Sequence, residues 1–180
     1  MSGRPTAPMR KVTTKITYLE MLRPYAAEAK PPVDGLSIEH LEAPSADEYR
    51  ALYRSVGRDY HWADRLLMPD DQLRAILQDD AVEIHLLRVG GQPAGYSELD
   101  RRTAGQIELA YFGLFPEFTG RGLGRYFLAW TLQKAWSYRP KRVWVHTCDL
   151  DHPAALPMYL KTGFRIYHEK TAEQVVLDDY

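Results

Sequence analysis

The chain has 180 residues, of which 45% are hydrophobic, and its formal net charge is −1. This length and composition predict one soluble globular domain with a substantial core, and the balanced charge disfavours nucleic acid or an anionic membrane as a partner. Cys148 is the only cysteine, which excludes an internal disulfide and a Cys-based zinc site. Neither an apolar run of about 20 residues nor a secretory signal is present, so we expect a cytoplasmic protein.

The start of the chain predicts an arm and an added strand. Residues 1–10, which are rich in glycine and proline, are expected to be disordered, and residues 11–180 to form a single domain. Within that domain, residues 11–35 are interpreted as an N-terminal extension. Polar and apolar residues alternate over 11–20, a pattern typical of a strand, which we interpret as an added edge strand.

The rest of the chain alternates between strand and helix patterns. Ser45 followed by Glu48 forms a capping box, which predicts that a helix begins there. The elements expected around it are, in chain order, a strand at 36–41, this first helix, a helix at 71–78, a hairpin of 82–89 and 93–100 turned by Gly90-Gly91, a strand at 106–115, a helix ending near Tyr138, a strand at 142–148, a short helix at 153–161 and a final pair of strands within 164–177. This order indicates a mixed α/β fold.

Glycines separate the strand at 106–115 from the helix that follows it. Gly120, Gly122 and Gly124 stand at this junction, together with Arg121 and Arg125. A helix start has backbone N–H groups without helical partners and carries partial positive charge. Because glycine has no Cβ atom, a pyrophosphate can approach those amides closely. The junction therefore predicts a site for a phosphorylated cofactor.

Two other phosphate-binding loops do not fit the junction. A P-loop requires Gly-Lys-Ser or Gly-Lys-Thr, which the chain lacks. A dinucleotide-binding turn requires a third glycine where Arg125 stands, and an acidic residue roughly twenty positions later. No acidic residue occurs between Arg125 and Cys148.

The frame from Thr119 to Gly124 resembles the acetyl-CoA-binding signature of the GCN5-related N-acetyltransferases, which reads Gln or Arg, two residues, Gly, one residue, Gly or Ala. Thr119 stands where Gln or Arg is usual. Upstream, residues 108–116 resemble the family's fourth strand. Downstream, the run from His152 to Tyr159, followed by Gly163-Phe164, resembles the family's Asn-Pro-x-Ala-x-x-x-Tyr-x-x-x-Gly-Phe ending, with His152 in place of Asn and Pro157 inside the helix. The match covers about residues 106–164.

The resemblance implies a fold and an activity. The fold would be a mixed, mostly antiparallel, twisted sheet with helices on both faces. The activity would be direct transfer of an acetyl group from acetyl-CoA to a primary amine of a small molecule or protein, by a monomer or homodimer. The pyrophosphate would rest on the amides after Gly120, and the main chain of β-strand residues would pair with pantetheine. The cofactor-binding residues implied are Phe112, Leu114, Thr119, Gly120, Arg121, Gly122, Leu123, Gly124, Arg125 and His152.

Two residues are candidates for the chemistry. Glu108 lies eleven positions before Thr119, where some members of the family carry a base. Burial between Ile107 and Leu109 would raise the pKa of this carboxyl, as suits a base, although a surface or salt-bridged glutamate is the alternative. Tyr159 matches the family tyrosine that protonates the departing thiolate. Its alternative is a structural tyrosine of the core.

The remaining candidates concern the acceptor. Tyr60, Trp62 and His146 are expected at the acceptor-binding walls, although aromatic residues at the first two of these positions are as typical of a core. Asp151 or His152 is expected to cap the short helix rather than to hold a metal ion. Two rival functions stay open: a covalent mechanism through Cys148, and an acyl-CoA-binding regulatory module without turnover.

Overall fold

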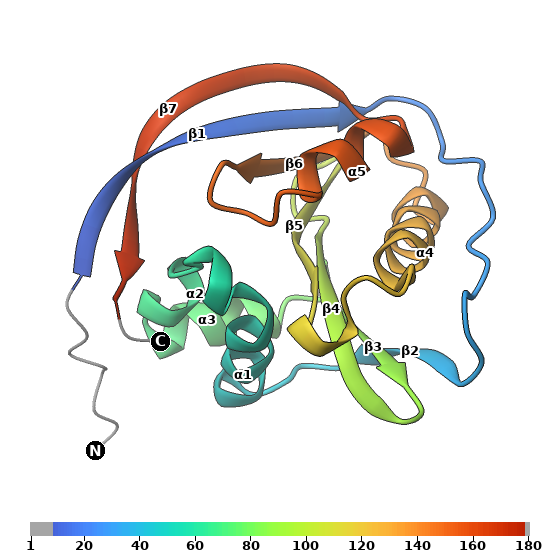
Figure 1. Ribbon diagram of the computed structural model, residues 1–180, viewed down its shortest axis with the longest axis horizontal. Helices are drawn as coiled ribbons and strands as arrows, with labels where there is room; N and C mark the ends of the chain where they lie inside the picture. The colour runs from blue at the N-terminus through green and yellow to red at the C-terminus, as the bar shows by residue number, and fades with distance from the viewer. Residues whose placement is uncertain (1–8, 179–180) are drawn as a thin grey trace.

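The structure, a computed structural model, describes residues 9–178 and is built around one seven-stranded sheet (Figure 1). The strand order is β2-β3-β4-β5-β6-β1-β7. Neighbouring strands are antiparallel except β5 and β6, which are parallel. The mixed, mostly antiparallel sheet is thus confirmed. The strands are β1 (Met9–Met21), β2 (Leu36–Leu41), β3 (Val82–Val89), β4 (Gln92–Asp100), β5 (Gln106–Leu114), β6 (Arg142–Cys148) and β7 (Arg165–Leu177).

Helices cover both faces of the sheet (Figure 1). Neighbouring residues of β5 show this, because Phe112 packs on Phe127 of α4 (5.4 Å between ring centroids), whereas Tyr111 packs on Tyr53 of α1 (5.1 Å). The capping box of Ser45 and Glu48 is present at the start of α1, as predicted. The helices are α1 (Ala46–Gly57), α2 (Asp64–Leu67), α3 (Asp70–Leu77), α4 (Leu123–Ser137) and α5 (Ala155–Thr162), with 3-10 turns at Arg58–Tyr60 and Pro116–Phe118.

β1 is an interior strand, so the prediction of an edge strand was wrong. It pairs with β6 on one side and with β7 on the other, and the two long strands arch together over the molecule (Figure 1). The expected pair of strands within 164–177 is also wrong, because β7 is one continuous strand. This segment contains no glycine, proline or asparagine at which a hairpin could turn. The partner strand comes from the start of the chain instead.

The predicted disordered arm lies mostly outside the described residues. Its positions 1–8 are not described, while Met9 and Arg10 begin β1. The connection from β1 to β2 passes beside α4, where Gln133 Nε2 donates a hydrogen bond to the carbonyl oxygen of Ala27 (2.7 Å). In the part of the chain that the structure describes, none of the helices has the length and apolar character needed to span a membrane.

Candidate active site

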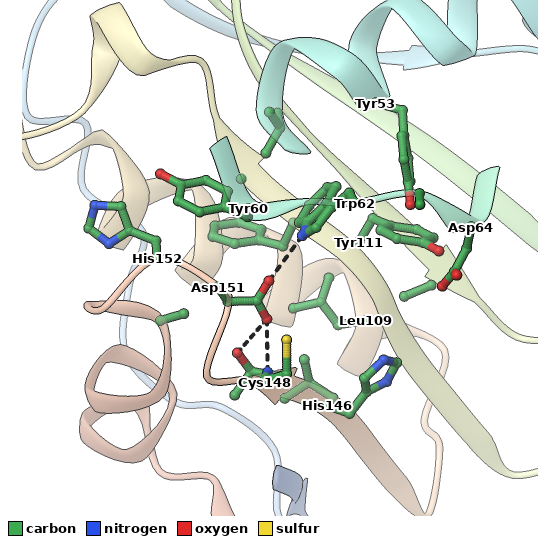
Figure 2. A pocket seen from close by; sticks show the side chains of 18 of the residues that line it. Tyr53, Tyr60, Trp62, Asp64, Leu109, Tyr111, His146, Cys148, Asp151 and His152 are labelled. Carbon is green, nitrogen blue, oxygen red and sulfur yellow. Dashed lines mark hydrogen bonds between the residues drawn. The ribbon is translucent and has the colours of Figure 1, made fainter. Parts of the chain in front are cut away.

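A wedge opens in the middle of the sheet where two parallel strands part. β5 and β6 pair only from Gln106 to Glu108 against Arg142 to Trp144. Beyond that point each strand continues without pairing to the other, β5 to Leu114 and β6 to Cys148. A cavity of about 880 Å³ occupies this opening, and both strands line it together with the segment after α1 and the start of α5 (Figure 2).

The glycine junction lies at one end of this cavity. Gly120 and Gly122 have φ angles of +75° and +76°, a region that residues with side chains rarely adopt. Tyr126 donates the first helical hydrogen bond of α4, to the carbonyl oxygen of Gly122 (3.3 Å), so the amides before it have no helical partner. A Cβ atom at Gly120 would have open space around it. The two glycines therefore turn the chain into α4 and leave its first amides accessible.

The residues predicted to bind the cofactor divide into two groups. Arg121, Gly122, Leu123 and Arg125 do not line the cavity. The side chains of Arg121 and Arg125 are exposed on the outer side of the junction, whereas that of Leu123 is buried in the core. The predicted residues that do line the cavity are Phe112, Leu114, Thr119, Gly120, Gly124 and His152.

Thr119, which stands in place of the usual Gln or Arg, is turned toward its own chain. Its hydroxyl donates a hydrogen bond to the carbonyl oxygen of Pro116 (2.8 Å). The side chain thus closes the 3-10 turn at Pro116–Phe118.

Glu108 and His146 form a pair at the edge of the cavity. His146 lines the cavity, whereas Glu108 does not. The carboxylate oxygen Oε1 of Glu108 lies 3.5 Å from Nδ1 of His146. The expectation that Ile107 and Leu109 enclose this carboxylate was wrong. Successive residues of a strand point to opposite faces, so the two apolar side chains are buried on the α4 face while Glu108 points away from it. The neighbour that matters for Glu108 is His146, on the adjacent strand.

Tyr159 lies on α5 and lines the cavity. Its side chain is 5% exposed and packs edge-on against Phe164, with 5.7 Å between ring centroids. Burial, and to a smaller extent the charge of Asp151, raise the pKa of the Tyr159 hydroxyl well above its usual value. This phenol therefore stays protonated at neutral pH and can donate a hydrogen bond into the cavity.

Asp151 connects the two walls of the cavity (Figure 2). Trp62 Nε1 donates a hydrogen bond to Asp151 Oδ1 (3.0 Å). The other carboxylate oxygen accepts hydrogen bonds from the Thr147 hydroxyl (2.6 Å) and the Cys148 amide (3.0 Å). The prediction that Asp151 or His152 caps the short helix was wrong, since α5 has Ala154 at its N-cap and no side-chain cap. Asp151 instead fixes Trp62 against the end of β6.

His152 and Tyr60 face each other nearby. Nδ1 of His152 accepts a hydrogen bond from the amide of Ala154 (3.0 Å), which orients the ring before α5 begins. The rings of Tyr60 and His152 meet edge to face at 5.8 Å (Figure 2). The cavity thus brings together all three predicted acceptor-wall residues, Tyr60, Trp62 and His146. Among residues 9–178, no group of three or more His, Cys, Asp or Glu side chains is arranged to hold a metal ion.

Cys148 is poorly suited to act as a nucleophile. Burial and the nearby charge of Asp151 raise the pKa of its thiol. The thiol also donates a weak hydrogen bond to Gln174 Oε1 (3.7 Å). A reactive cysteine requires the thiolate, which this environment disfavours.

Sequence reasoning missed several residues of the cavity. Tyr53, Trp62 and Tyr111 form a mutually packed aromatic cluster, with ring centroids 5.1 to 5.4 Å apart. Tyr53 belongs both to the core cluster on α1 and to the cavity lining, and helical periodicity alone cannot separate these two roles. Nothing in the sequence pattern placed the strand β7 beside the site. Further lining residues not predicted include Ile16, Asp64, Met68, Thr147, Glu173 and Gln174.

The buried carboxylate of Glu98 holds an arginine that packs against the aromatic cluster of Tyr53, Trp62 and Tyr111. Glu98 of β4 accepts hydrogen bonds from Arg65 (2.6 Å) and from the Tyr49 hydroxyl. The Arg65 guanidinium lies 5.2 Å from the centroid of the Tyr111 ring. Arg65 belongs to α2, so this ion pair ties the segment after α1 to the sheet.

We expect Tyr49→Phe to lower the free energy of unfolding by roughly 1–3 kcal/mol, because Glu98 loses a buried hydrogen bond. Tyr96→Phe is the matched control. Both tyrosines are 0% exposed, and in the described part of the chain the Tyr96 hydroxyl has no hydrogen-bond partner. Urea denaturation at neutral pH measures both variants. Equal losses in the two variants would contradict a specific role of the bond to Glu98.

Comparisons with known proteins agree with this architecture. A model of the acetyltransferase (GNAT) family matches residues 49–164. No curated protein sequence matches the chain.

Solved structures share the fold at low sequence identity. A GCN5-related N-acetyltransferase from Kribbella flavida is 19% identical with a TM-score of 0.61, covering 96% of this chain and 61% of that one. One from Sphaerobacter thermophilus is 17% identical with a TM-score of 0.65, covering 96% and 54%. An aminoglycoside acetyltransferase from an uncultured soil metagenomic sample is 14% identical with a TM-score of 0.58, covering 72% and 88%. The chain therefore spans little more than half the length of the first two structures.

Proposed function

We propose that this chain, which belongs to the acetyltransferase (GNAT) family, transfers the acetyl group of acetyl-CoA directly to a primary amine. The observation that carries the proposal is the parting of β5 and β6 beside the uncapped start of α4. A gap between two strands leaves main-chain groups of β5 without partners, and an extended amide chain such as pantetheine can pair with them. The helix start supplies amides and partial positive charge for a pyrophosphate.

The cofactor is proposed to run from the junction into the cavity. The amides from Arg121 to Gly124 hold the pyrophosphate, and the exposed guanidinium groups of Arg121 and Arg125 add positive charge at its outer side. The main chain of Phe112 and Leu114, which lines the cavity, pairs with the pantetheine amides. In this position the thioester reaches the part of the cavity that Tyr159 and His146 line.

The reaction then removes two protons from the ammonium nitrogen, and the departing sulfur needs one proton or a hydrogen bond. An ammonium ion must lose a proton before its nitrogen can attack the thioester carbonyl. We assign that step to the pair formed by His146 and Glu108, in which the imidazole faces the cavity and the carboxylate orients it. The neutral amine forms the C–N bond and gives up a second N–H proton as the C–S bond breaks. That proton replaces the one that Tyr159 supplies to the departing thiolate, or passes to solvent when Tyr159 only donates a hydrogen bond. The raised pKa of Tyr159 keeps its hydroxyl protonated at neutral pH, so that the hydroxyl is available to donate a hydrogen bond to the developing thiolate.

A direct test measures free thiol released from acetyl-CoA in the presence of a broad panel of primary amines. Amine-dependent release supports the transferase. Calorimetric binding of coenzyme A without release for any amine would instead support the rival function, an acyl-CoA-binding regulatory module.

Tyr159→Phe is expected to slow turnover roughly 10- to 100-fold at unchanged affinity for coenzyme A, since the hydroxyl acts on the departing thiolate and not on the bound thioester. The phenylalanine keeps the packing on Phe164. Steady-state kinetics and calorimetry on the same preparation separate the two effects. Wild-type turnover in Tyr159→Phe would leave the tyrosine with a structural role only.

A further inference from the structure

Among residues 9–178, one half of the sheet carries a row of partly exposed rings on the face opposite α4 and α5. α1 contacts β4 and β5, whereas the same face of β6, β1 and β7 carries exposed side chains. Tyr167 is 42% exposed, and the side chain of His146 is 45% exposed. We call this row the aromatic strip; it consists of Tyr18, Trp144, His146, Tyr167 and His168.

Strand register places the strip and Glu108 on one face. Glu108 is paired with Trp144, and Tyr18 is paired with His146 on one side and with His168 on the other. Directly paired residues of neighbouring strands point to the same face. The Tyr18 ring accordingly lies 5.6 Å from His146, 5.5 Å from His168 and 6.1 Å from Tyr167 between centroids.

The strip is continuous with the cavity. His146 belongs to both, because it lines the cavity and its ring lies 6.3 Å from that of Trp144. A molecule whose amine reaches His146 from the open side therefore has its remaining atoms over Trp144 and Tyr18.

Charge is distributed unevenly along this path. In the described part of the chain, the residues that line the cavity include the carboxylates of Asp64, Asp151 and Glu173 but no lysine or arginine. Lys170 pairs with Ile16, which lines the cavity, so this lysine lies at the inner end of the strip, where its Nζ is 5.4 Å from the Tyr18 ring centroid. At the outer end, Arg142 Cζ lies 4.4 Å from the Tyr167 ring centroid, and Arg142 Nε pairs with Glu20 Oε2 (2.9 Å). The three carboxylates outnumber the Lys170 ammonium, so a single cation is attracted to the inner end, whereas the arginine at the outer end is already paired with a carboxylate.

We propose that the aromatic strip binds the body of the acetyl acceptor, and that the preferred acceptors are monoamines in which a short alkyl chain joins the amine to an aromatic ring. This inference rests on the proposed transferase function. Flat rings pack on Trp144 and Tyr18 by stacked or edge-to-face contacts, which a saturated ring cannot reproduce. Polyamines have no ring to pack on the strip, and amino acids bring a carboxylate toward the acidic cavity, so both classes are disfavoured.

The test compares 2-phenylethylamine with 2-cyclohexylethylamine, which has a similar size and charge, and with spermidine. We expect the highest kcat/KM with 2-phenylethylamine. Tyr18→Leu and Trp144→Leu should each lower that kcat/KM roughly 3- to 10-fold, mainly through KM, with little change for the cyclohexyl compound. Ile166→Ala is the control, because Ile166 is 42% exposed and pairs with Leu19, whose side chain is buried on the other face. Thermal unfolding checks that the variants are folded.

A preference for spermidine, or equal losses for the two ring compounds, would overturn the inference. Calorimetric binding of 2-phenylethylamine to the coenzyme A complex separates it from the proposed function. Binding that depends on Trp144, without turnover of any amine, would support the strip and contradict the transferase. Turnover of other amines without binding of 2-phenylethylamine would support the transferase and contradict the proposed role of the strip. If the protein neither turns over an amine nor binds 2-phenylethylamine, both proposals are overturned.

Discussion

Replacing Gly122 by glutamate is expected to abolish binding of acetyl-CoA. The residue precedes α4, next to amides that are proposed to hold the pyrophosphate, and a carboxylate there repels the diphosphate at close range. Contacts between like charges cost several kcal/mol, so affinity for coenzyme A should fall at least roughly 100-fold. Isothermal titration calorimetry with coenzyme A measures the change.

The φ angle of +76° at Gly122 requires two control variants. Any side chain in this left-handed conformation costs about 1–2 kcal/mol of stability. A Cβ atom would otherwise make only ordinary contacts, 3.6 Å from the Cβ atom of Pro32. Gly122→Ala therefore introduces the strain without the charge, and Gly122→Lys introduces the strain with the opposite charge. If all three folded variants bind coenzyme A equally well, the pyrophosphate does not lie at this helix start.

Local sequence patterns predicted the fold correctly where the structure of a segment depends only on residues within that segment. The capping box at Ser45, the turn at Gly90-Gly91 and the glycines before α4 all act within a few residues, and the structure contains each of these elements. The place of β1 in the sheet was not predictable in this way. It depends on pairing between strands at opposite ends of the chain, for which alternating polar and apolar residues give no register.

The candidate site likewise contains residues that local sequence patterns could identify and contacts that they could not. Tyr159 was found because it stands in a recognisable motif, and Trp62 and His146 because of their places relative to the expected helices and strands; the structure brings all three to one cavity. The hydrogen bond from Trp62 to Asp151 joins residues 89 positions apart in sequence, so no local pattern could predict it. The apolar residues on either side of Glu108 in sequence led to the wrong prediction that they enclose its carboxylate. Sequence neighbours in a strand point to the opposite face, so the residue beside Glu108 in space is His146 on the adjacent strand.

Glu108→Gln is expected to keep binding of acetyl-CoA and to lower turnover by roughly 10²–10⁴-fold, because Glu108 and His146 are proposed to act together as the general base, whose usual contribution has this size. The amide has a similar shape but cannot accept a proton or hold a charged imidazole as a carboxylate does. His146→Gln, which removes the proposed base itself, should in contrast flatten the acidic limb of the rate profile, because that limb reports protonation of the base. Steady-state kinetics across the pH range measure both changes. Glu39→Gln is the control, since Glu39 lies on β2 and pairs with Arg88 (2.8 Å) away from the cavity.

The distance of 3.5 Å between Glu108 and His146 adds a stricter test. If the imidazole takes the proton and the carboxylate orients it, the two residues act as one unit. Effects of residues that act as a unit are not additive, so Glu108→Gln combined with His146→Gln should be hardly slower than the slower single variant. Additive losses would mean that the two residues act separately, with Glu108 reaching the amine through water. Full activity of Glu108→Gln with an unchanged pH profile would make the carboxylate structural and leave the proton to another group.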